Sequence, residues 1–104
     1  MKKIYFSLKN NFDWDSYEKK VYNNIVNSLE KVEVTWDLKE MTEIPSFTII
    51  FKQVALMKKN KESIEKNIEK NIVIVSSVEK KIFLLWVFDY IYKPVNKTII
   101  IKKD

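Results

Sequence analysis

The segment "WDLKEMTEIPSF", Trp36 to Phe47, places a serine where a polar loop meets the predicted start of a helix. A phosphate on Ser46 would lie near the free backbone N–H groups and the positive end of the helix dipole. The same hydroxyl could act only as a helix cap, because serine is among the residues preferred there. Ser46 is therefore a candidate regulatory site, although a structural cap is the interpretation that we favour.

Three aspartates, Asp13, Asp15 and Asp37, follow the first two predicted strands. In a parallel sheet such positions lie near the carboxyl ends of strands, where α/β proteins usually bind ligands. Two carboxylates there could hold a magnesium ion, which would suit a small Mg-dependent enzyme. However, Asp15 with Glu18 three residues later resembles a capping box. We therefore expect a helix cap and a solvated loop, with no metal site.

The residue types that are missing exclude several kinds of chemistry. The 104-residue chain contains no cysteine, no histidine and no glycine. It therefore has no thiolate, no histidine base or metal ligand, and no glycine-rich loop that could hold a nucleotide phosphate. We predict that the protein is not an enzyme and uses no cofactor.

The formal net charge of +5 comes from lysine alone, because the chain has no arginine. One interpretation is electrostatic attraction to nucleic acid or to an anionic membrane. The other is a solvated lysine surface, which the mixture of lysine and glutamate in "KKNKESIEKNIEK" favours. Arginine is the usual reader of base edges, so its absence argues against specific nucleic-acid recognition.

Strands and helices are predicted to alternate along a single domain, residues 1–104. Short apolar segments predict strands and four-residue apolar spacing predicts helices. The expected strands are Lys3–Leu8, Val32–Leu38, Asn71–Ser76 and Thr98–Ile101. The expected helices are Trp14–Glu30, with Leu29 on its apolar face, Pro45–Lys59, with Pro45 in its first turn, and Val78–Tyr92. The β-α-β-α-β-α-β order predicts an α/β fold with a four-stranded, mainly parallel sheet.

Two strands carry information about how the sheet is covered. Val32–Leu38 alternates apolar and polar residues, which suggests a sheet covered mainly on one side, or an edge strand. Within Asn71–Ser76 the four residues from Ile72 to Val75 are all apolar, which is typical of a central parallel strand. Ser76 with Glu79 resembles a second capping box, so a helix should follow. Residues 61–70 are expected to form a turn of helix or a loop.

The last predicted helix is apolar on nearly every side, since Asp89 is the only charge between Lys81 and Lys93. A helix that covers a sheet normally keeps a polar face. The excess could be core, a surface for self-association or for a partner, or a membrane-surface contact. The candidate interaction residues are of types that anchor interfaces: Trp86, Phe88, Tyr90 and Tyr92.

From Val32 to Ile101 the chain resembles the STAS domains of anti-sigma-factor antagonists. That family has a strand ending in Asp-Leu, a loop, and Ile-Asp-Ser-Ser-Gly at the start of a helix. Asp37-Leu38 matches the strand motif, and Ile44-Pro45-Ser46 falls on the Ile-Asp-Ser. The resemblance implies a protein-binding regulatory module that is often switched by serine phosphorylation. Phe47 occupies the usual acceptor position, however, so the switch itself does not carry over.

We therefore expect a non-enzymatic, STAS-like regulatory or scaffolding module that binds a protein partner or itself. The surface is expected at the Pro45–Phe51 helix start, with Asp37, Ser46 and Phe47, and on the Val78–Tyr92 helix. The alternative is lysine-mediated, nonspecific binding of nucleic acid or an anionic membrane. With no signal peptide or membrane span visible in the sequence, we expect a soluble cytoplasmic protein.

Overall fold

The computed structural model describes residues 1–43, 45–91, 93–94 and 96–103. The strands are β1 (Lys2–Ser7), β2 (Val32–Asp37), β3 (Ile68–Val75) and β4 (Thr98–Lys102). The helices are α1 (Trp14–Val21), α2 (Phe47–Lys59), α3 (Lys61–Asn67) and α4 (Val78–Tyr90), and a π-helical turn, η1 (Tyr22–Val26), continues α1. The chain is a single α/β domain in which helical segments separate the strands, as predicted.

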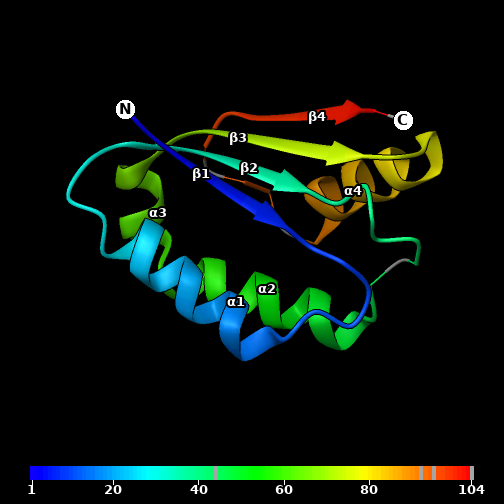
Figure 1. The fold of residues 1–104 in the computed structure, drawn as a ribbon, viewed down its shortest axis with the longest axis horizontal. Coiled ribbons are helices and arrows are strands. Elements are labelled where there is room, and N and C mark those ends of the chain that lie inside the picture. The colour runs from blue at the N-terminus through cyan, green and yellow to red at the C-terminus, as the bar shows by residue number, and fades with distance from the viewer. Residues whose placement is uncertain (44, 92, 95, 104) are drawn as a thin grey trace.

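The four strands pair in the order β1-β2-β3-β4, and every pair is parallel. Each connection therefore steps to the next neighbour in the same direction across the sheet. Right-handed crossovers then place all the helices on one face, as Figure 1 shows. The opposite face carries no helix within the described ranges. The alternation in β2 reflected this one-sided cover, and β3 is central, as its apolar run predicted.

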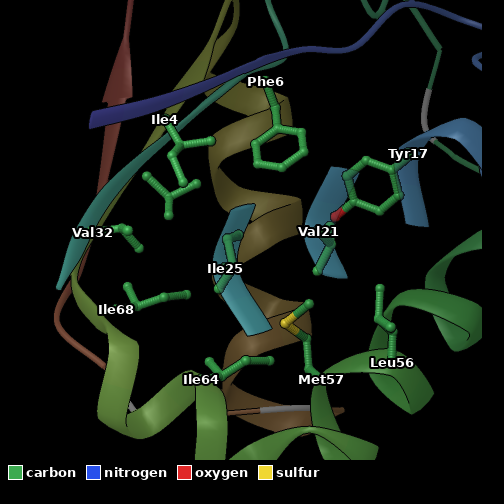
Figure 2. Close-up of a cluster of buried hydrophobic side chains, with 11 residues drawn as sticks. Ile4, Phe6, Tyr17, Val21, Ile25, Val32, Leu56, Met57, Ile64 and Ile68 are labelled. Atoms are coloured by element: carbon green, nitrogen blue, oxygen red, sulfur yellow. The ribbon is translucent and has the colours of Figure 1, made fainter. Parts of the chain in front are cut away.

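The main hydrophobic core lies between the covered face of β1 and β2 and the helices α1, α2 and α3 (Figure 2). Alternate strand residues point into it because side chains in a strand alternate between faces. Phe6 is stacked on Trp36 and meets the ring of Tyr17 edge-on. The buried members are Ile4, Phe6, Tyr17, Val21, Ile25, Val32, Val34, Leu56, Met57, Ile64 and Ile68.

The first helix is shorter than the predicted Trp14–Glu30. After Val21 it widens into η1, in which the Asn27 N–H donates to the Tyr22 carbonyl at 2.9 Å. Leu29, predicted to be buried, is fully exposed at 104%. The cause is local: the Ser28 hydroxyl accepts from the Glu30 N–H at 3.3 Å, forming a turn that competes with the helix.

The cap of α1 also differs from the prediction. Asp13, not Asp15, is the N-cap residue, and Asp15 lies in the first turn. The Asp13 carboxylate accepts a hydrogen bond from the Ser16 hydroxyl at 2.6 Å instead of capping a backbone N–H. This bond is the main reason that the pKa of Asp13 is lowered. Asp13 is therefore engaged within its own turn.

The cap of α4 is one residue later than predicted. The Ser77 hydroxyl accepts from the Lys80 N–H at 3.2 Å, so Ser77 is the N-cap. The Ser76 hydroxyl accepts instead from the Lys80 ammonium at 3.3 Å. Ser76 and Ser77 are equally good N-cap residues by local sequence preference. The point at which β3 ends determines which of them caps the helix.

Three boundaries were also refined by the structure. Residues 61–67 form the helix α3, and β3 begins at Ile68 instead of Asn71. Pro45 lies before the cap of α2, outside the first turn where it was expected. Asn60 ends α2, as predicted. Among the described residues, no helix is both long and apolar enough to cross a membrane.

Candidate functional site

Ser46 is the N-cap of α2. Its hydroxyl accepts a hydrogen bond from the Ile49 N–H at 3.3 Å, and its extended backbone sets the entry into the helix. Ser46 therefore has the structural role of a helix cap, which was the favoured interpretation. The Ser46 side chain is exposed, and its role as a regulatory site is the alternative to the cap.

A hollow of about 420 Å³ adjoins Ser46 where the loops after β1 and β2 meet. Asn10 joins these loops: its amide donates to the Thr42 hydroxyl at 2.6 Å and accepts from the Glu43 N–H at 3.3 Å. Asn11 adopts a positive φ of 59°, a conformation that asparagine tolerates in turns. This hollow was not predicted from the sequence, although loops that follow neighbouring parallel strands must lie side by side.

Asp37 lies at the end of β2 on the uncovered face of the sheet, where it is buried. Its carboxylate accepts from the Tyr5 hydroxyl and, at 3.0 Å, from the Lys39 N–H. The Lys39 ammonium lies 3.8 Å away. Burial alone would raise the pKa of Asp37, but these donors and the lysine charge together lower it. The bond to Asp37 is also the main reason that the pKa of Tyr5 is raised.

Replacing this carboxylate is expected to reduce stability in a pH-dependent way. A carboxyl whose pKa is lower in the folded state stabilises the fold at pH values above its unfolded pKa of about 3.9. This stabilisation is lost as the pH falls through the folded-state pKa. Asp37→Asn should therefore lower the free energy of unfolding by about 1 kcal/mol at neutral pH. The difference from wild type should vanish in acid once the carboxyl is protonated. Urea unfolding at several pH values measures this.

The matched control is Asp89→Asn, because Asp89 is exposed on α4. Its effect should stay within about 0.5 kcal/mol at every pH. A difference for Asp37→Asn that is constant down to acid pH would contradict the assigned role of the charge.

One side of α4 presents large apolar side chains to solvent. Trp86 is 45% exposed and Tyr90 is 77% exposed, and their ring centroids are 6.0 Å apart. Phe83 extends the row, with its centroid 6.3 Å from that of Trp86. Ile82, at 61% exposed, adds to this side of the helix. We call Ile82, Phe83, Trp86 and Tyr90 the aromatic row of α4.

The opposite side of α4 faces the sheet and α2. Val87 is buried there, and half-buried Phe88 lines a cavity between α2 and α4. Phe88 was grouped with Trp86 as a candidate interaction residue, but the structure places the two on different sides of the helix. Tyr92, the last member of that group, lies outside the described residues.

The exposed start of α2 carries a second aromatic pair. Phe47 and Phe51, one helical turn apart, are 59% and 56% exposed. Their rings are stacked with centroids 6.1 Å apart. Phe47 thus lies next to the Ser46 cap and faces solvent, as a candidate interaction residue must.

The three aspartates weighed as a magnesium site have separate roles. Asp13 bonds to Ser16, Asp15 lies in the first turn of α1, and Asp37 bonds to Tyr5 and Lys39. In the part of the chain that the structure describes, no three acidic side chains gather in a way that could hold a metal ion.

Comparison with known proteins does not identify a family for this chain. No protein-family model matches the chain, and searches of curated proteins and of solved structures return no match. The STAS resemblance therefore depends on the short motifs of the sequence and on the α/β architecture.

Proposed function

We propose that this chain is a non-enzymatic regulatory or scaffolding module that binds a protein partner or a second copy of itself. The observation that carries the proposal is the aromatic row of α4. Tryptophan and tyrosine dominate the binding energy of many interfaces, because they bury a large area at a small entropic cost. Apolar patches on a monomeric protein are usually small, and larger ones mark interaction sites.

The uncovered face of the sheet supports an assembled state. Parallel sheets are normally buried on both faces. Here the second face carries Ile72, Ile99 and Ile101, which are only half-buried. Ile72 pairs with Ile99 across β3 and β4, so the isoleucines lie side by side on this face. A partner on this face would give the sheet the second cover that such sheets usually have.

The finer assignment, a STAS-like module, has two supports. Asp37 ends β2, and Ser46 caps the helix that follows the next loop. These are the positions that the family motif gives to its strand aspartate and to the first serine of its pair. The proposal does not extend to a phosphorylation switch, since Phe47 occupies the acceptor position of the family.

The test is the molar mass in solution across a concentration series, for wild type and Trp86→Asp. An aspartate in place of an anchoring tryptophan should weaken self-association by about tenfold or more. Because Trp86 is 45% exposed, the variant should keep its circular dichroism spectrum. Light scattering should show wild type gaining mass with concentration while the variant remains a monomer.

Leu29→Asp is the matched control, because it also replaces an exposed apolar residue with aspartate, but away from α4. Its mass should follow that of wild type. Equal masses for wild type and Trp86→Asp at every concentration would contradict self-association through α4.

The lysine-based alternative stays a prediction, and the same samples test it. Binding to generic DNA that is strong at low salt and collapses as salt rises would favour it, because counterion release drives such binding. Trp86→Asp should leave that binding unchanged.

A further inference from the structure

A cavity of about 230 Å³ lies between α2 and α4 on the covered side of the sheet. Val54 of α2 and Leu84 of α4 line it from opposite walls, and Trp36 and Val73 contribute to its floor. Its lining is overwhelmingly apolar. Protein interiors are normally close-packed, so an empty space of this size leaves its lining without packing partners.

The cavity is elongated along β3. Ile68, Asn71, Val73 and Val75 all line it, which takes it from one end of the strand to the other. At about 3.3 Å per residue, these seven steps span roughly 23 Å. Phe12 and Trp14 also line the cavity, so it widens toward α1 and is partly open to solvent. Its largely apolar lining along β3 suits an extended chain.

The volume suits a small molecule. An engineered apolar cavity of about 150 Å³ is known to bind benzene, so this larger cavity has room for a small apolar ligand.

The charged side chains that line the cavity are Lys80 and Glu43. Glu43 is exposed, so water and salt screen its charge. Lys80 is half-buried in the first turn of α4 and bonds to the Ser76 hydroxyl at 3.3 Å. Within the described residues Lys80 has no ion pair. A partly desolvated cation at one end of an apolar cavity favours a ligand with an anionic head.

We propose that the cavity between α2 and α4 binds a single-chain amphiphilic carboxylate, of the class of medium-chain fatty acids. The tail lies along β3 between the two helices, and the carboxylate lies at Lys80. This site uses the side of α4 that faces the sheet. Of the aromatic row, Phe83 also lines the cavity, whereas Trp86, which tests the row, does not. A ligand here would also fill the space that separates α2 from α4.

The first experiment uses decanoate, decanol and a brominated decanoate, each below its micelle concentration. Calorimetry should show that decanoate binds more tightly than decanol. The brominated probe should quench the tryptophan fluorescence, because a heavy atom quenches only near contact and both Trp14 and Trp36 line the cavity. No binding of either ligand, or binding without quenching, would overturn the proposal.

The second experiment blocks the cavity from each wall. Val54→Phe and, separately, Leu84→Phe should each weaken decanoate binding by about tenfold or more, because the added ring occupies the path of the tail. Ala55→Phe is the matched control, since Ala55 is the exposed neighbour of Val54 on α2. Its affinity should equal that of wild type. One substitution is made in each helix, so that a folding defect in one variant still leaves the other as a test. Unchanged decanoate affinity in a folded Val54→Phe or Leu84→Phe variant would overturn the proposal.

The third experiment tests the head group. Lys80→Gln should weaken decanoate binding by roughly threefold to tenfold and leave decanol binding unchanged. Lys81→Gln, the adjacent lysine that does not line the cavity, should change neither. Equal losses for decanoate and decanol, or the same loss in Lys81→Gln, would overturn the assignment of the carboxylate to Lys80.

Discussion

Phe6→Ala is expected to lower the free energy of unfolding by about 3–5 kcal/mol, the usual cost of removing a buried aromatic ring. Phe6 is 2% exposed at the centre of the core (Figure 2). Its ring stacks on Trp36 with centroids 4.6 Å apart and meets Tyr17 edge-on at 5.5 Å. The alanine would remove both contacts and leave a cavity between β1 and α1. A loss of this size is a large share of the stability of a small domain.

Urea unfolding followed by circular dichroism measures this loss. Leu29→Ala is the control, because Leu29 is also a large apolar residue but is fully exposed. Its effect should stay within about 0.5 kcal/mol. Similar losses for the two variants would mean that the core is not where the structure places it.

Asn67→Ala is expected to cost about 2–3 kcal/mol, because it removes the partner of buried polar groups. The Asn67 amide donates to the carbonyl of Ile25 at 2.9 Å and to that of Val26 at 3.2 Å. These carbonyls lie at the end of η1, where the last carbonyls of a helix lack their regular intrahelical partners. The Ile25 carbonyl also accepts from the Ser28 N–H at 3.2 Å, so the Asn67 amide adds to that bond. Asn67 therefore ties the end of α3 to the end of the first helical segment.

Thermal or urea unfolding of Asn67→Ala tests this, with Asn23→Ala as the control. Asn23 is exposed on η1, so its replacement should change stability by no more than about 0.5 kcal/mol. An Asn67→Ala variant as stable as wild type would show that water satisfies the two carbonyls equally well.

Asn67 also shows why part of the structure was not visible in the sequence. The segment "KESIEKN", residues 61–67, reads as polar and solvated, and nothing local marks its last asparagine as buried. Its partners are more than 40 residues away, at |i−j| = 42 and 41. The error at Leu29 has a local cause instead: the helical segment ends at Val26 and Ser28 forms a turn, so the four-residue spacing did not place Leu29 on a buried face.

The residues of the candidate site also differ in whether their positions could be predicted from the sequence. That Ser46 caps a helix could be predicted, because a serine after proline and before an apolar helix has few other roles. That Trp86 and Phe88 belong to different sides of α4 could not be predicted. In a helix that is apolar nearly all round, hydrophobic periodicity does not indicate which side is buried.

The sequence by itself determined the order of strands and helices and the mainly parallel sheet, and it left two interpretations of β2, a sheet covered mainly on one side or an edge strand. The order and the parallel sheet follow from side-chain periods of about 2 and 3.6 residues and from the handedness of crossovers, which act within each segment or between neighbours. Only the tertiary structure decided which side of α4 faces the sheet, where Asp37 finds Tyr5, and that a cavity lies between α2 and α4. Each of these depends on surfaces that are distant in sequence and meet only when the sheet is assembled in the order β1-β2-β3-β4.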